Sequence, residues 1–232
     1  MAGKIVAVFN QKGGCGKTTS TMQLAGTFGS RGYRTHVTDM DRQNTATLWG
    51  FQASDEHPFP ATVLSMAPLK EGFLDKMSGI IQKHDLIFID CPPALDSLVP
   101  WAALLACDLA LIPVIPVMDN VWASKQAEEL VFLARDARKK RGEKGDGPKA
   151  AYLVNMLRRG KVFESCLETL RNKAKLPILK NSISMRNVFP ESQLYGCVVK
   201  AFGKSEGANE IDRLADEISD LLGLNAIGRK AA

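Results

Sequence analysis

The sequence has no long uninterrupted apolar run, and it has no closely spaced pair of cysteines. Its most apolar stretch, residues 104–117, contains Asp108, Pro113 and Pro116 and is shorter than the ~20 residues that span a bilayer. The five cysteines are odd in number and include no C-x-x-C pair, which argues against a disulfide framework and a compact zinc site. The first residues lack the cleavage pattern of a signal peptide. We therefore expect a cytoplasmic protein with reduced thiols and no membrane partner.

Internal repeats, low-complexity segments and an extreme composition are also absent from the sequence. Its 232 residues are 45% hydrophobic and 24% charged, as in an ordinary globular protein. This length suits one large α/β domain and is short for two. We expect a single domain over residues 1–232, with a flexible tail at about 224–232.

The net charge of +5 is distributed unevenly along the chain. Residues 135–204 hold 17 basic and 6 acidic side chains, a net charge of +11. Such a region can give one face of the fold a positive potential that attracts a polyanion. The charge count alone leaves a solvated face equally open.

Short apolar runs rich in β-branched residues alternate with segments of helical periodicity. Alternation of this kind indicates an α/β fold with a mostly parallel, doubly wound sheet flanked by helices. The expected strands are residues 4–9, 35–39, 85–90, 109–114, 150–156 and 178–183, and the expected helices are 18–30, 69–83, 97–107, 122–140, 162–173 and 207–222.

A glycine-rich loop directly follows the first expected strand. Backbone N–H groups of such a loop converge on phosphate oxygens, and the next helix adds its N-terminal dipole. Lys17 can then reach the β- and γ-phosphates, while the Thr18 hydroxyl can bind Mg²⁺. The predicted ATP/ADP site comprises Lys12, Gly13, Gly14, Cys15, Gly16, Lys17, Thr18 and Thr19.

The loop departs from the common P-loop pattern because Gln11 stands in place of its first glycine and Lys12 follows. The segment KGGCGKTT resembles the deviant Walker A motif of the ParA/MinD family of P-loop ATPases, most closely that of the ParA-type ATPases. The resemblance implies that Lys12 crosses the interface of an ATP-bound homodimer and contacts the partner's nucleotide. A cation at that seam also stabilises transition-state charge, so Lys12 joins Lys17 as a predicted catalytic residue.

Three further segments resemble the same family. Residues 37–43 look like its D-x-D-P-Q segment, which makes Asp41 the predicted water-positioning catalytic residue, although Arg42 replaces the proline. Residues 86–93 look like its Walker B strand, so Asp90 is predicted to hold Mg²⁺ with Thr18. Asn155 falls where family members place an asparagine against adenine.

Absent residues set several branches of the family aside. The C-terminal residues lack the amphipathic membrane helix of the MinD branch, and the tyrosine-rich tail of the related kinases is missing. The positive region instead suggests the DNA-associated branch, in which backbone contacts bind any DNA sequence. The predicted DNA contacts are Arg158, Arg159, Lys161, Lys173, Lys175, Lys180 and Arg186.

The resemblance implies a switch in which ATP closes a dimer and the dimer binds non-specific DNA on the nucleoid. A ParB-like or cargo-adaptor protein then stimulates hydrolysis, and a plasmid, chromosome or protein cargo is positioned. Two alternatives stay open on the same fold. One is a MinD-like membrane-associated spatial regulator, and the other is a metabolic or metal-insertion ATPase.

Overall fold

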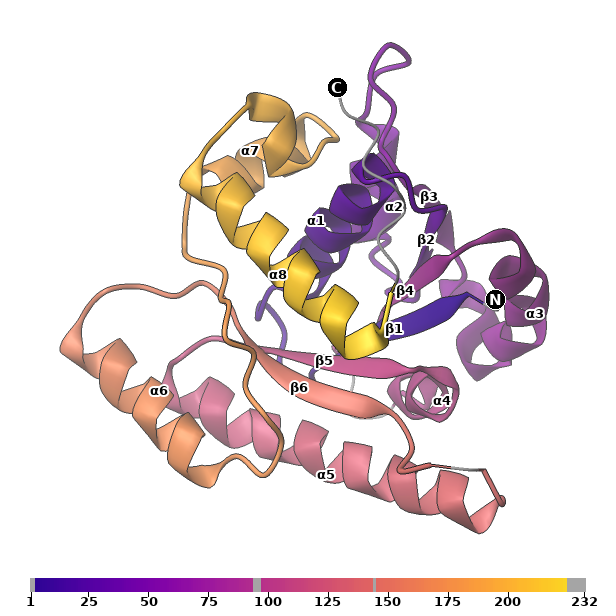
Figure 1. The fold of residues 1–232 in the computed structure, drawn as a ribbon, viewed down its shortest axis with the longest axis vertical. Coiled ribbons are helices and arrows are strands. Elements are labelled where there is room, and N and C mark those ends of the chain that lie inside the picture. Colours follow the sequence, from indigo (N-terminus) through magenta and orange to yellow (C-terminus); the bar gives the residue numbers. More distant parts are fainter. Residues whose placement is uncertain (1–2, 94–96, 144, 225–232) are drawn as a thin grey trace.

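The computed structural model describes residues 3–93, 97–143 and 145–224. Within these ranges, six parallel strands form a sheet in the order β3-β2-β4-β1-β5-β6 (Figure 1). Strands β2, β4 and β5 are buried along their whole length, as parallel strands covered on both faces are. The strands are β1 (Lys4–Val8), β2 (Thr35–Asp39), β3 (Thr62–Ser65), β4 (Leu86–Asp90), β5 (Leu109–Val114) and β6 (Lys149–Val154).

Helices cover both faces of this sheet, and each face has its own apolar core. One core joins the sheet to α3, α4 and α5, and the other joins it to α1, α2, α7 and α8. The predicted doubly wound α/β class is therefore confirmed. The helices are α1 (Lys17–Ser30), α2 (Thr45–Phe51), α3 (Leu74–Lys83), α4 (Val99–Ala106), α5 (Met118–Lys140), α6 (Lys161–Lys173), α7 (Val188–Leu194) and α8 (Glu206–Leu222), with 3-10 segments η1 (Ala67–Phe73) and η2 (Val199–Phe202).

Several elements differ from those expected. The helix predicted at 69–83 is divided, because Lys70 adopts φ +50° inside η1 and the regular helix α3 begins only at Leu74. The long helix α5 begins four residues before the predicted start. The short elements α2, β3 and α7 were not expected at all, and each has seven residues or fewer.

The strand predicted at 178–183 is wrong. This segment runs beside β6 and makes only isolated parallel bridges, such as Tyr152 with Ile178. The Glu217 side chain on α8 explains the interruption, since its carboxylate accepts hydrogen bonds from the backbone N–H groups of Lys180 and Asn181 at 2.7 and 3.0 Å. Backbone donors that bond to a carboxylate are lost to a sheet ladder.

Two further predictions concern the ends of the chain and the membrane. The tail predicted to be flexible, about 224–232, lies outside the described residues except for Leu224. Over the three described ranges, we find no helix of the length and apolarity needed to cross a bilayer.

Candidate nucleotide-binding site

The glycine-rich loop connects β1 to α1 at the carboxyl edge of the sheet. Gly14 has φ +73° and Gly16 has φ +85°, which are left-handed conformations that glycine adopts without strain. Gly13 and Gly14 are exposed, and a Cβ added at either would meet no atom within 4 Å. The loop thus faces open space beside the N-terminus of α1, which is the arrangement that receives phosphate oxygens.

Two buried asparagines hold this loop from behind. Asn10 donates from Nδ2 to the carbonyl of Pro113 at 2.8 Å and accepts from the backbone N–H of Lys12 at 3.2 Å. Asn155 donates from Nδ2 to the carbonyl of Cys15 at 3.1 Å, and a Cβ on Gly16 would lie 2.1 Å from that nitrogen. The adenine contact of Asn155 stays a prediction, while the observed contacts make it an anchor of the loop.

Lys17 and Cys15 are the buried side chains of the loop. The Lys17 side chain is almost enclosed, and its Nζ donates to the carbonyl of Lys12 at 3.1 Å. Cys15 donates from Sγ to the same carbonyl at 3.2 Å, and burial raises the pKa of its thiol. Thr19 is half-buried. Lys17 is therefore a cation at the base of the loop, positioned to meet phosphate charge.

Thr18 and Asp90 meet at the end of β4. The Thr18 hydroxyl donates to the Asp90 carboxylate at 2.7 Å, and the Thr21 hydroxyl lies 3.3 Å from its other oxygen. Burial raises the pKa of Asp90 to about 7, and the nearby carboxylates of Asp39 and Asp41 add to this rise. A buried carboxylate of this kind is stabilised by a cation.

These oxygens fit Mg²⁺, which prefers one or two protein oxygens together with phosphate and water. Across the described residues, no group of three or more His, Cys, Asp or Glu side chains could hold a metal ion. Thr18 and Asp90 would hold Mg²⁺ jointly with the nucleotide, and this role stays a prediction.

Asp39, at the end of β2, is a residue to which the sequence reasoning gave no role. Its fully buried carboxylate accepts from the backbone N–H and the hydroxyl of Thr47, at 2.9 and 2.8 Å, and from the backbone N–H of Asp41 at 3.1 Å. Asp41 is half-buried and accepts from the backbone N–H of Gln43 at 3.0 Å. Asp39 thus ties the predicted switch loop to α2. The two aspartates at positions 39 and 41 were the sequence feature that could have indicated a role for Asp39.

The side chain of Lys12 lies on the outside of the loop. Its Nζ is 3.7 Å from the carboxylate of Asp119, in the first turn of α5. The Lys12 side chain is 42% exposed, in contrast to the buried Lys17. The Lys12 side chain therefore points towards solvent and Asp119, whereas the Lys17 side chain points into the loop.

The seven predicted DNA contacts do not form one cluster of equivalent side chains. Arg158, Arg159 and Lys161 are exposed between β6 and α6, and the Arg158 guanidinium lies 5.8 Å from the Phe163 ring centroid. The other exposed candidates are Lys173, Lys175 and Lys180. Arg186 differs, because its guanidinium donates to the Glu210 carboxylate at 2.8 Å.

Comparison with known sequences finds relatives of this chain. The maintenance of carboxysome distribution protein A of Halothiobacillus neapolitanus is 29% identical over 215 residues, which are 92% of this chain and 95% of the relative. Soj, a sporulation initiation inhibitor protein of Bacillus subtilis, is 31% identical over 148 residues, 48% of this chain and 58% of the relative. The chain thus spans nearly all of the first relative and about half of the second.

Solved structures show the same fold at lower identity. Apo McdA of Cyanothece has a TM-score of 0.73 at 16% identity, over 93% of this chain and 99% of that one. MinD of Pyrococcus horikoshii with Mg-ADP has a TM-score of 0.68 at 21% identity, over 95% and 98%. The model of the CobQ/CobB/MinD/ParA nucleotide binding domain matches residues 6–227. With this match and the phosphate loop described above, the chain belongs to that family and is an ATPase of the ParA/MinD type.

Proposed function

We propose that this ATPase forms a homodimer with ATP, binds DNA of any sequence while dimeric, and positions a cargo on the nucleoid. A partner protein stimulates hydrolysis, and hydrolysis releases the DNA. The observation that carries the proposal is the outward placement of Lys12, beside a loop whose own phosphate lysine is Lys17.

Lys12 is suited to contact a second subunit. Its ammonium group is partly exposed and its ion pair with Asp119 is long and solvent-accessible, so little free energy is lost when the pair opens. Two nucleotides brought face to face concentrate negative charge at the seam. A lysine from each subunit offsets that charge and stabilises the dimer.

The chain's own residues supply the parts of a hydrolysis site. Lys17 binds phosphate charge at the base of the loop, and Thr18 and Asp90 hold Mg²⁺. When bound, the metal ion neutralises charge on the phosphate oxygens. Asp41 lies at the same edge of the sheet, where its carboxylate orients a water and accepts its proton.

The DNA surface is assigned to the exposed cations around α6. Arg158, Arg159 and Lys161 precede the helix, and Lys173 and Lys175 lie at its other end. Side chains of this kind contact backbone phosphates and give salt-dependent binding without sequence preference. Arg186 is the weakest candidate, because Glu210 already neutralises it.

A protein assembly is the cargo that we place first. The relative that matches over 92% of this chain is named for the distribution of carboxysomes. Another relative, from Myxococcus xanthus, is named a chromosome partitioning protein and matches over 48% of this chain. Plasmid and chromosome cargo are therefore the alternatives.

A gel-shift titration on DNA of arbitrary sequence tests the proposal. The protein is titrated with ADP, with ATP and with a slowly hydrolysed analogue, at two salt concentrations. We expect retention only with ATP or the analogue, weakening at the higher salt. Equal retention with ADP, or none with any nucleotide, would contradict it.

The Lys12→Ala variant tests the role of that lysine. We expect it to bind ATP with nearly unchanged affinity, because Lys17 still meets the phosphates, but to lose ATP-dependent dimerisation and DNA retention. Light scattering reports the dimer, and a fluorescent ATP analogue reports binding. A variant that still dimerises with ATP would show that Lys12 does not act across subunits.

A further inference from the structure

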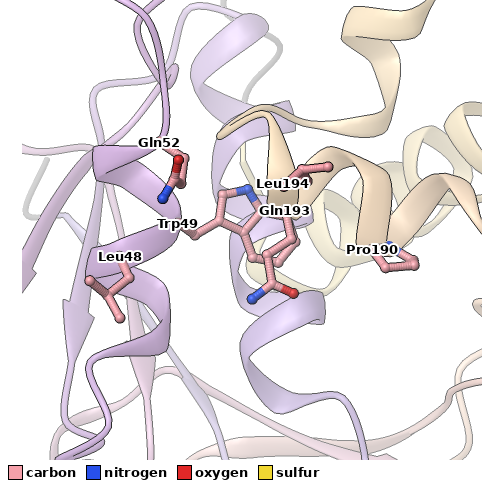
Figure 2. Close-up of a pocket in the computed structure, with 6 residues that line it drawn as sticks. All are labelled: Leu48, Trp49, Gln52, Pro190, Gln193 and Leu194. Atoms are coloured by element: carbon pink, nitrogen blue, oxygen red, sulfur yellow. The ribbon is translucent and has the colours of Figure 1, made fainter.

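An open groove of about 350 Å³ lies between α2 and α7, on the helical layer that also contains α1 and α8 (Figure 2). Its lining contains no charged side chain, and its polar side chains are two glutamines and the Trp49 indole. It is therefore poorly suited to a phosphorylated or metal-bound small molecule. The lining residues are Leu48, Trp49, Gln52, Pro190, Gln193 and Leu194.

The two walls of the groove are held at a fixed separation. The Trp49 indole N–H donates to the carbonyl of Cys197 at 3.1 Å. Gly196 has φ +61°, and a Cβ there would lie 2.0 Å from the backbone nitrogen of Ala53. On the inner side, Gln23 of α1 donates to the Ser192 hydroxyl of α7 at 2.7 Å. The groove is thus a rigid part of the fold.

Large apolar side chains border the groove and face solvent. Leu48 and Phe51 are 57% and 80% exposed, and their spacing of three places them on one face of α2. Leu194 and Tyr195 are 67% and 63% exposed at the end of α7. Phe202 extends this surface, because its ring packs edge-on against that of Tyr195, with 6.0 Å between the ring centroids. Exposed apolar side chains on both walls of a groove favour a site where another molecule binds.

Three acidic side chains lie next to the elements that form the groove, although the chain carries a net charge of +5. Asp55 and Glu56 follow α2, in the segment that Gly196 contacts through Ala53, and Glu191 follows Pro190 on α7. All three are exposed, and in the described part of the chain none of them forms an ion pair. Carboxylates at the rim favour a cationic partner and repel DNA.

We propose that this groove binds a cationic amphipathic segment of a partner protein. Apolar side chains of the segment occupy the space between Leu48 and Leu194, and its lysines or arginines pair with Asp55, Glu56 and Glu191. A helix that places apolar anchors at i, i+3, i+4 and i+7 in a groove is the binding mode that fits.

The position of the groove connects it to the nucleotide site. Leu48 adjoins Thr47, whose hydroxyl and backbone N–H both donate to Asp39. Asp39, at the end of β2, is in turn the register partner of Asp90, at the end of the neighbouring strand β4. A partner in this groove would therefore contact the helix that Asp39 holds beside the nucleotide site. That link rests on the proposed function, whereas binding itself requires neither nucleotide nor DNA.

Fluorescence anisotropy with designed peptides tests the groove in the absence of nucleotide and DNA. The probe is a labelled helical peptide with leucines at the four anchor positions and lysines elsewhere, and a second peptide carries glutamates in place of the lysines. We expect the lysine peptide to bind and the glutamate peptide to bind at least about tenfold more weakly. Equal affinity for both peptides would overturn the proposed chemistry.

Exposed positions give variants that should fold normally. The double variant Leu48→Ser, Leu194→Ser should weaken binding of the lysine peptide by about tenfold or more, because two leucine side chains that the bound peptide would cover are lost. Glu191→Lys should weaken it by a smaller factor. Leu133→Ser, at a side chain 58% exposed on α5, is the matched control and should bind as the parent does. Unchanged binding by the double variant would overturn the site.

Two other occupants would also overturn the proposal. If the nucleotide-free protein self-associates and the double variant is monomeric, the groove binds a second copy. If the protein binds phosphatidylglycerol vesicles and the double variant does not, the groove binds a lipid surface. Peptide binding without ATP-dependent DNA retention would support the groove and contradict the proposed function. ATP-dependent DNA retention without peptide binding would support the proposed function and contradict the groove.

Discussion

The carboxyl edge of the sheet and the surface around α6 differ in how far their charged side chains are buried and held by hydrogen bonds. At the sheet edge, Lys17 and Asp90 are buried, and both have hydrogen-bond partners within the fold. Around α6, Arg158, Arg159 and Lys161 are exposed. The first region is pre-organised for one small polyanion, whereas the second provides charge without fixed geometry.

This difference predicts how substitutions act. At the sheet edge, each group depends on the others, so a single change should remove the function of the whole site. On the exposed surface, the contribution of each cation to DNA affinity should be small, nearly additive and dependent on salt. The following variants test that contrast, in order of decreasing effect.

Lys17→Ala should cause the largest loss. A charge-assisted contact to phosphate contributes about 3 kcal/mol, so ATP affinity should fall by about a hundredfold. Titration with a fluorescent ATP analogue measures the change, and Lys12→Ala is the matched control because it removes an equal charge from the same loop. Comparable losses in the two variants would mean that the two lysines do not have separate roles.

His36 shows what happens to a buried polar side chain that lacks a partner. It lies in β2, three residues before Asp39, and is only 2% exposed, yet neither ring nitrogen has a hydrogen-bond partner among the residues that the structure describes. Burial lowers the pKa of His36 from 6.5 to about 4, and the nearby His84 ring contributes to the decrease. The folded protein therefore contains neutral His36, whereas the unfolded chain binds a proton near its ordinary pKa.

We expect His36 to weaken the fold in acid. Because its folded pKa is the lower one, its contribution is fully present above about pH 6.5 and is lost as the pH falls towards 4. The shift corresponds to about 3 kcal/mol of unfolding free energy across that window. Urea unfolding of the parent and of His36→Leu at several pH values measures this. The acid-induced loss should be smaller in the variant, and equal losses would refute the assignment to His36.

The sequence was sufficient to predict the strands and the glycine-rich loop that are determined by neighbouring residues. The apolar runs before the loop and before Asp90 became β1 and β4, and the glycine positions of the loop were correctly read as a turn before α1. These features need only neighbouring residues, since strand burial and left-handed glycines are set within a few positions.

Features that depend on distant residues were missed or wrong. Trp49 anchors the short helix α2 by a bond to a residue 148 positions away, and no local pattern indicates this. The expected strand at 178–183 was interrupted by Glu217, which lies on a different helix. The contacts that Asn155 makes with the phosphate loop likewise join residues about 140 positions apart. Tertiary contacts of this range override local preference.

Arg158→Gln should have the smallest effect, and it tests the exposed side of the comparison. Because one phosphate contact of several is lost, ATP-dependent DNA affinity should fall only a few-fold, and the salt dependence of log K should decrease by about one unit of slope. Lys76→Gln, on the exposed face of α3, is the matched control because it changes the net charge equally at a position away from α6. Gel shifts at several salt concentrations separate the two. An equal effect of both variants would mean that net charge acts rather than a local surface, while complete loss in Arg158→Gln would mean that this arginine belongs to a fixed site like that of Lys17.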